Sequence, residues 1–298
     1  MRYDWVSFTS DYGRVDGFVA ACHGVILREA PHVRVIDITH DVPPGDLRRG
    51  ATVLAQTVGS LPRAVHLAVV DPGVGTQRRG LALDAGEGIL VGPDNGLLVL
   101  AAEVLGGVSA VYELTERELW AYEPSPTFHG RDVFAPVVAH LANGVEPARV
   151  GRELDWRDLV RLPEPLVTVG AGEFTAEVLT IDRFGNVQLA ALDCDIESAA
   201  LRLAQPVAVT VDPTAQACGV PTGAGPGAAS RTVRGTVGRT FGDVAPGELV
   251  VFVDSAWQVA IAVNAGSAAE TLSVTPGQLV RVISYFEGSE GSGRPSSG

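Results

Sequence analysis

The chain has 298 residues, 35 acidic and 22 basic, and its formal net charge of −13 would repel a nucleic-acid backbone over most of the surface. Nucleic acid is therefore not an expected partner. All 22 basic residues are arginines, because the sequence contains no lysine. This excludes a P-loop lysine, a Schiff base to pyridoxal phosphate and a lysine nucleophile.

Hydrophobic residues make up 46% of the chain, which favours a globular fold over a disordered chain. The longest apolar runs, such as residues 64–70, fall far short of the roughly 20 residues that span a bilayer. The N-terminus shows no secretory signal pattern, so we expect a soluble, cytoplasmic protein without a membrane partner. Cys22, Cys194 and Cys218 form no C-x-x-C pair, which favours reduced thiols.

The first half of the chain alternates strand and helix patterns, which predicts an α/β domain with a mostly parallel central sheet. The expected elements are, in order, a strand at 5–10, a helix at 16–28, a strand at 33–39, a helix at 45–58, a strand at 64–71, a hairpin near 80–91, and helices at 96–104 and 131–142. In such sheets, ligands bind at the carboxyl ends of the strands.

Prolines and a Gly-Ala-Gly step interrupt this pattern at residues 162–172, and short β-rich segments with turn residues between them follow. These segments predict a compact barrel or sandwich. The expected strands lie at 174–181, 186–191, 207–211, 232–237, 249–253, 259–263 and 279–284, with a loop at 213–230. The expected domains are 1–163 (α/β), 164–172 (linker), 173–286 (all-β) and 287–298 (disordered tail).

Aspartates gather where the strands of the first domain are expected to end. Asp11 and Asp16 follow the first strand and Asp71 follows the third, positions that suit ribose hydroxyls, amines or metals. Asp16 has an alternative reading as a helix cap. Asp37 and Asp41 are interpreted as caps and turn residues.

A metal site near Asp37 would need His40 and His23, which stand close to it in the sequence. No His-x-x-x-His or similar pair fixes a ligand spacing there, so we expect no metal.

Asp71-Pro-Gly-Val-Gly-Thr-Gln-Arg78 places an arginine seven residues after an aspartate, with glycines that permit close backbone approach. Such a pair would keep the carboxylate ionised, although an ordinary turn with an ion pair has the same pattern. Spacing alone favours Arg78 over Arg79. His129 precedes an expected helix whose dipole would favour a neutral imidazole able to accept a proton; a purely structural histidine is the alternative.

In the second domain, Asp182-Arg-Phe184-Gly-Asn186 ends a strand with a carboxylate, an aromatic ring and an amide. This combination suits a purine, and a plain β-turn is the alternative. The segment Asp254-Ser255-Ala-Trp257, followed by Ala262-Val-Asn264-Ala265, is either a hairpin or a ligand-binding edge.

Taken together, these motifs resemble the adenosine-forming S-adenosylmethionine (SAM) hydrolases, also called hydroxide adenosyltransferases, which are relatives of fluorinase and chlorinase. The resemblance spans about residues 5 to 286. It rests on Thr9-Ser-Asp11-Tyr-Gly, Asp16, Val70-Asp71-Pro-Gly-Val-Gly, Arg78, Gly92-Pro-Asp-Asn-Gly-Leu-Leu, Thr127-Phe-His129-Gly-Arg-Asp, Ile181-Asp182-Arg-Phe-Gly-Asn186, Phe241-Gly-Asp-Val-Ala-Pro-Gly-Glu and Asp254-Ser255.

The resemblance implies a C-terminal β-barrel and a homotrimer with sites between one N-terminal domain and a neighbour's C-terminal domain. It implies SAM as the substrate and adenosine as a product, with no cofactor. The implied water-activating residues are Asp71, Arg78 and His129. The implied substrate-binding residues are Asp11 for the ribose, Asp16 and Asp182 for the methionine amine, Phe241, Asn186 and backbone near Ala265 for the adenine, Ser255 near the methionine carboxylate, and Phe184 beside Asn186.

The chemistry agrees with this resemblance. A sulfonium leaves as a neutral thioether, so the reaction needs an oriented, activated water rather than a general acid. The halogenases lack an aspartate at the position of Asp71, and a carboxylate there would repel a halide. Ala256 stands where halogenases have arginine. The alternatives are a halogenase, a non-catalytic adenosine- or SAM-binding module, and a metal-dependent phosphohydrolase.

Overall fold

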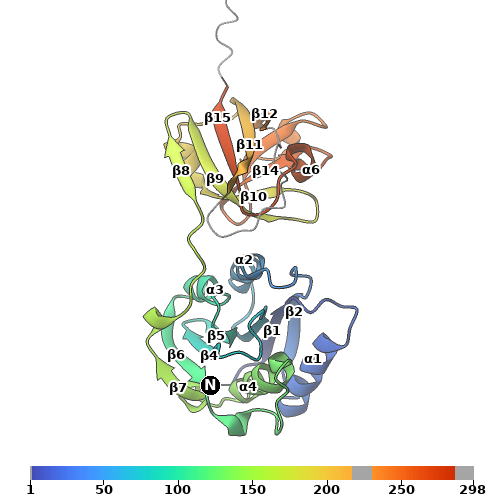
Figure 1. Ribbon diagram of the computed structural model, residues 1–298, viewed down its shortest axis with the longest axis vertical. Coiled ribbons are helices and arrows are strands. Elements are labelled where there is room, and N and C mark those ends of the chain that lie inside the picture. Colours follow the sequence, from blue (N-terminus) through green and yellow to red (C-terminus); the bar gives the residue numbers. More distant parts are fainter. Residues whose placement is uncertain (1, 217–229, 286–298) are drawn as a thin grey trace, which may run out of the picture. The chain divides into compact units, whose positions relative to one another are not determined.

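The computed structural model describes residues 2–216 and 230–285, and its chain divides into two compact units, Met1–Pro163 and Glu164–Gly298 (Figure 1). The expected tail at 287–298 lies outside the described residues. So does the expected loop at 213–230, except that strand β11 continues to Gln216 and residue 230 is described.

The first unit is a seven-stranded sheet, counted over the described residues, with helices on both faces (Figure 1). The strand order is β2-β1-β3-β5-β4-β6-β7. The strands are β1 (Trp5–Ser10), β2 (Arg34–Thr39), β3 (Ala64–Val69), β4 (Gly80–Ala85), β5 (Gly88–Pro93), β6 (Val108–Leu114) and β7 (Gly151–Leu154). The helices are α1 (Phe18–Glu29), α2 (Leu47–Val58), α3 (Val99–Val104) and α4 (Ala135–Ala142), with a π-helical turn at Gly130–Phe134 and short 3-10 turns at Arg117–Leu119, Pro147–Arg149 and Trp156–Asp158.

Two hydrophobic clusters cover the two faces of this sheet. One joins α1 and α4 to β1 and β3 through residues such as Ile26, Phe8 and Val138. The other joins α2 and α3 to the opposite face through residues such as Leu54 and Ala101. Strands buried on both faces read as continuous apolar runs, which is why β3 could be predicted from the sequence.

The α/β class is confirmed. Strands β2, β1, β3 and β5 pair in parallel, whereas β4, β6 and β7 add antiparallel pairings, so the sheet is more mixed than expected. Strands β6 and β7 were not expected from the sequence. The predicted helix at 131–142 is interrupted, because its first turn is π-helical.

The second unit is a closed barrel of seven strands, counted over the described residues. The order β10-β14-β13-β12-β11-β15-β9 closes because β9 also pairs with β10. Closure leaves no free edge within the ring. The strands are β8 (Val167–Gly170), β9 (Glu173–Ile181), β10 (Val187–Leu192), β11 (Pro206–Gln216), β12 (Arg231–Val237), β13 (Leu249–Val253), β14 (Gln258–Val263) and β15 (Gln278–Ser284), with helices α5 (Asp193–Ser198) and α6 (Ala268–Leu272) and a 3-10 turn at Phe241–Asp243.

The barrel prediction is therefore confirmed over the sandwich alternative. Alternate residues of β9, such as Phe174, Ala176 and Val178, are fully buried in the barrel core. The segment 164–172, expected as a linker, contains β8, which pairs with β9 outside the ring. Within the described residues, none of the helices has the length and apolar character needed to cross a lipid bilayer.

Candidate active site

Asp71 stands just beyond the carboxyl end of β3, whose six residues are all buried. The side-chain amide of Asn95 donates to the carbonyl oxygen of Val70 at 2.9 Å and so fixes this end of the strand. The chain then turns, since the Val74 amide donates to the Asp71 carbonyl oxygen at 3.1 Å. This turn returns Arg78 to the carboxylate of Asp71.

Arg78 contacts both Asp71 and His129. Its Nε donates to the two carboxylate oxygens of Asp71 at 3.0 and 2.9 Å, and its Nη2 contacts Oδ2. The same Nη2 lies 2.8 Å from Nδ1 of His129. Only 12% of the Arg78 side chain and 6% of the Asp71 side chain are exposed, and Phe134 lies under the guanidinium. Shielding from water strengthens these charged contacts.

The contact with Arg78 fixes the tautomer of His129. A guanidinium only donates hydrogen bonds, so Nδ1 of His129 accepts and the ring proton resides on Nε2. Burial lowers the pKa of His129 below its usual 6.5, and the Arg78 charge lowers it further. The lowered pKa favours a neutral imidazole, and its main causes are burial and Arg78 rather than a helix dipole.

Two loops far apart in the sequence meet around these side chains. Gly75 has a φ of +77°, and a Cβ there would lie 2.5 Å from the carbonyl oxygen of Pro126. Only glycine accommodates both the conformation and the approach. Asp132 holds the second loop, because its Oδ2 accepts from the Ser125 amide at 2.8 Å. His129 thereby reaches Arg78.

Arg79 points to a different partner. Its Nε and Nη2 donate to Oδ2 of the buried Asp94 at 2.8 and 2.5 Å, and Nη2 also donates to the Asp158 carbonyl oxygen. Asp94 in turn accepts from the Val160 amide at 3.0 Å. Arg79 and Asp94 therefore hold the chain near Asp158 and Val160 in place. Arg78 is the arginine that contacts Asp71.

Asp11 follows β1 at the same edge of the sheet. Its Oδ2 accepts from the Gly45 amide at 2.9 Å. A Cβ on Gly45 would lie 3.7 Å from the Cβ of Pro72, so the segment that Asp11 holds packs beside the residue after Asp71.

Asp16 is exposed and lies just before α1. The residue at the N-cap of that helix is Gly17, and no side chain caps the helix by a hydrogen bond. The helix-cap reading of Asp16 is therefore wrong, and its carboxylate faces solvent.

In the second unit, Asp182 and Asn186 form one tight loop. Oδ1 of Asp182 accepts from the amides of Phe184 (2.8 Å) and Asn186 (2.9 Å), while Oδ2 accepts from the Asn186 side chain at 2.8 Å. Phe184 is 71% exposed. At Gly185, a Cβ would lie 2.1 Å from Ser267 Oγ, so the loop packs against Ser267.

That contact brings the loop close to Ala265, which precedes Ser267 by two residues and has a φ of +58°. Phe241 is 44% exposed and packs edge-to-face on Phe252, with ring centres 5.2 Å apart. Ser255 is exposed in the turn between β13 and β14. These side chains are accessible on the second unit.

Tyr12 is a residue of this site that the sequence analysis did not single out. Its ring packs edge-to-face on Phe128, with centres 5.7 Å apart, and burial raises the pKa of its hydroxyl. A Cβ on Gly130 would lie 2.0 Å from the Tyr12 hydroxyl oxygen. Tyr12 therefore supports the turn that carries His129, and its only signal in the sequence is its place beside Asp11.

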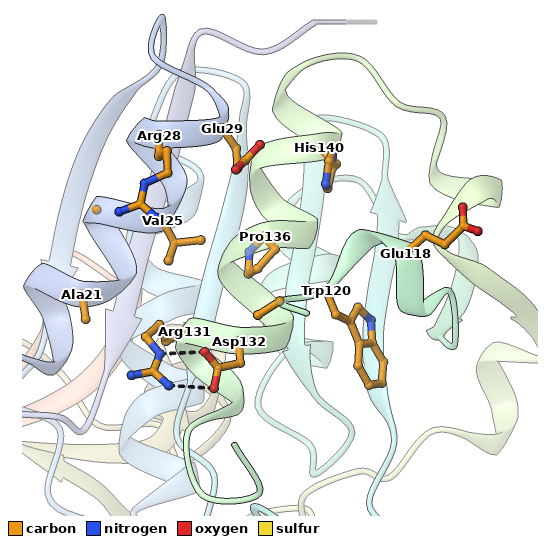
Figure 2. A pocket seen from close by; sticks show the side chains of 12 residues that line it. Ala21, Val25, Arg28, Glu29, Glu118, Trp120, Arg131, Asp132, Pro136 and His140 are labelled. Atoms are coloured by element: carbon orange, nitrogen blue, oxygen red, sulfur yellow. Dashed lines mark hydrogen bonds and ion pairs between the residues drawn. The ribbon is translucent and has the colours of Figure 1, made fainter. Parts of the chain in front are cut away.

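The described part of the first unit includes two hollows. One, of about 470 Å³, is lined by Arg78 and His129. The other, of about 760 Å³, lies between α1 and α4, where Figure 2 shows the Arg131–Asp132 ion pair with Trp120 and His140 along the walls. Asp71, Arg78 and His129 do not line this second groove.

A two-domain fold of this kind, with an α/β unit followed by a β-barrel unit, is present in a solved structure. The crystal structure of an uncharacterized conserved protein from Thermotoga maritima matches with a TM-score of 0.82 at 34% identity, covering 93% of this chain and 99% of that one.

Sequence comparisons define the family. The SAM hydroxide adenosyltransferase N-terminal domain matches residues 6–151 and its C-terminal domain matches residues 176–281. The chain belongs to this family. A relative from Salinispora tropica named (R)-S-adenosyl-L-methionine hydrolase is 57% identical, covering 93% of this chain and 97% of the relative. A fluorinase from Actinopolyspora mzabensis is 28% identical, covering 93% and 96%.

Proposed function

We propose that this protein hydrolyses S-adenosyl-L-methionine to adenosine and L-methionine. The observation that carries the proposal is the hydrogen-bonded group of Asp71, Arg78 and His129 at the carboxyl end of β3. The name of the 57% identical relative supports the same reaction, and the fluorinase is more distant.

Asp71 is the base in this proposal. Water attacks the ribose C5′ from the side opposite sulfur, a C5′–O bond forms, and the C5′–S pair of electrons leaves on the neutral thioether of methionine. The water proton passes to Asp71 and then to solvent, so the sulfonium charge reappears as a released proton. A carboxylate has lone pairs beyond those that Arg78 occupies, so it can also hold the water.

His129 orients the water in this proposal. Its Nδ1 accepts from Arg78, so this nitrogen is not free to take the proton from the attacking water. The N–H at Nε2 can donate to the water oxygen and direct its lone pair toward C5′. Arg78 pairs with the Asp71 carboxylate and holds His129 in this tautomer.

We propose the remaining residues as the substrate-binding set. Asp11 would bind the ribose hydroxyls, and Asp16 and Asp182 the methionine amine. Asn186, Phe241 and the backbone at Ala265 would bind adenine, with Phe184 beside them, and Ser255 would lie near the methionine carboxylate. The exposed carboxylate of Asp16 and the exposed side chain of Phe184 suit these roles, because each must remain accessible until a ligand binds.

We further propose a homotrimer in which each site combines the first unit of one subunit with the barrel of its neighbour. The support is the division of the proposed set: Asp11, Asp16 and Asp71 lie on one unit, and Asp182, Asn186 and Phe241 lie on the other. A cyclic arrangement would build one complete site per subunit.

We propose that the reaction needs no cofactor, with SAM as the substrate, and that the enzyme acts in the cytoplasm. Cys22 and Cys194 are free thiols, which agrees with a reducing compartment. Cell fractionation with a tagged copy would test the location.

The decisive experiment incubates the purified protein with SAM in ¹⁸O-labelled water. We expect the ¹⁸O label at O5′ of adenosine. Unlabelled free methionine should form in an amount equal to that of adenosine. A parallel reaction with chloride or fluoride should give no 5′-halo-adenosine, because the Asp71 carboxylate repels a halide. Halide-dependent product would support a halogenase instead. SAM recovered intact after long incubation would support a binding module.

A further inference from the structure

Three potential metal ligands meet beside the proposed active site. His23 on α1 faces Asp37 on β2, and His40 follows the end of β2. Nε2 of His23 lies 2.8 Å, and Nε2 of His40 lies 3.1 Å, from Oδ1 of Asp37. Over the described residues, this is the only group of three or more such side chains whose ligand atoms all lie within 4.8 Å of one another.

One of these ligand atoms has no hydrogen-bond partner. His40 is 1% exposed, and its Nε2 is buried without a hydrogen bond among the described residues, although Oδ1 of Asp37 lies 3.1 Å away. Its Nδ1 lies 2.8 Å from Ser10 Oγ, which can accept a proton held on Nδ1. In that tautomer the lone pair of Nε2 points into the cluster.

We propose that His23, Asp37 and His40 bind one divalent transition metal ion, with Zn²⁺ as the representative ion. Two imidazoles and one carboxylate are donors that Zn²⁺ prefers, and a water would complete a tetrahedron. With bonds of about 2.0–2.1 Å, a tetrahedral ion separates its ligand atoms by about 3.3 Å. The separations of 2.8 and 3.1 Å from Oδ1 of Asp37 would widen to that value.

The surroundings fit such a site. Side-chain exposures of 27% for His23 and 32% for Asp37 leave a path for the ion, while His40 anchors the inner side. Ser10 would orient His40 as an outer-shell partner. The expectation of no metal site rested on spacing along the chain, and His23 and Asp37 are 14 residues apart.

The ion would stabilise the loop that carries Asp11. Ser10 directly precedes Asp11, and the Gly13 amide donates to the His40 carbonyl oxygen at 2.8 Å. A metal at this cluster would therefore join α1, the end of β2 and the end of β1, and its role would be structural.

Zinc binding to the whole purified chain tests this proposal. After treatment with a chelator, the protein is titrated with ZnCl₂ in competition with a chromogenic chelator. We expect one Zn²⁺ per chain, with affinity at least about tenfold weaker in His23→Gln and in Asp37→Asn, and about 10- to 100-fold weaker in Ser10→Ala. The melting temperature should rise with Zn²⁺ in the wild type and not in His23→Gln.

His140→Gln and Asp41→Asn are the matched controls. His140 lines the groove of Figure 2, and Asp41 is an exposed carboxylate next to His40, so both variants should bind Zn²⁺ like the wild type. Cys22 and Cys194 stay in every variant, so thiol binding cannot explain a loss. His23 is partly exposed, so His23→Gln serves even where Asp37→Asn does not fold. Equal Zn²⁺ affinity in the wild type and His23→Gln would overturn the proposal.

Discussion

At the scale of single residues, Arg78 determines what its neighbours can do. A guanidinium only donates hydrogen bonds, so Arg78 fixes His129 as an acceptor at Nδ1 and pairs with the Asp71 carboxylate. The proton acceptor in the proposed reaction is thereby Asp71, although the sequence left both Asp71 and His129 open.

Asp71→Asn should lower kcat by about 10²- to 10⁴-fold, because the amide cannot accept the water proton. Binding of adenosine, measured by calorimetry, should change little. Asp41→Asn is the control, since it removes an exposed carboxylate after β2 and should leave kcat unchanged. Full activity of Asp71→Asn would contradict the mechanism.

At the scale of elements, two loops and one strand position the site. The loop after β3 and the loop before the π-helical turn meet where Gly75 lies against Pro126. A shift of either loop would move Arg78 relative to His129. The contact depends on a glycine at one position.

Gly75→Ala should lower kcat by up to about 10²-fold, because a Cβ displaces the loop by a fraction of an ångström or more. Gly107→Ala is the matched control. Gly107 also has a positive φ, of 90°, but a Cβ there meets no atom within 4 Å. Gly107→Ala should lose about 1–2 kcal/mol of unfolding free energy from its positive φ alone. Gly75→Ala should lose more, because its Cβ also meets Pro126, and only Gly75→Ala should lose activity. Equal activity in the two variants would argue against the loop contact.

Strand β3 also makes the stability of the first unit depend on pH. His66 is fully buried, its Nδ1 lies 2.8 Å from Ser7 Oγ, and burial lowers its pKa to about 4. In the unfolded chain, His66 binds a proton below pH 6.5, whereas in the folded chain it does so only below about pH 4. The unfolding free energy should therefore decrease by about 3 kcal/mol as the pH is lowered from 6.5 to 4.

Denaturant titrations at several pH values measure this effect. His66→Gln should flatten the slope between pH 6.5 and 4, whereas His140→Gln should retain it, because His140 is partly exposed. Both variants keep all the carboxylates, so the carboxylates contribute equally to the pH dependence of the unfolding free energy in each. A slope that His66→Gln leaves intact would mean that other groups cause the acid sensitivity.

At the scale of the whole molecule, each unit carries part of the proposed set, so activity depends on how subunits assemble. Co-expression of Asp71→Asn with Asn186→Ala should restore about one quarter of the wild-type activity in mixed trimers, because that share of sites receives two intact units. Co-expression of Asp71→Asn with His129→Ala should restore nothing, since both changes lie on the same unit. Recovery absent from the first pair would place each site within one chain.

The sequence by itself determined the α/β unit, the β-rich unit and most of their strands, because periodicity and buried apolar runs are local properties. Strand β3 and the order of motifs from Asp11 to Asn186 are examples. The sequence did not indicate β6 or β7. These strands lie at one edge of the sheet, and most of their residues are only partly buried or exposed.

Only the tertiary structure decided which side chains meet. Arg78 and Arg79 are adjacent and chemically identical, and the fold sends one to Asp71 and the other to Asp94. His23 and Asp37 lie on different elements, so no local pattern could pair them. Which distant segments come into contact depends on the path of the chain and on the conformation of its loops. The spacing of residues along the sequence does not specify either.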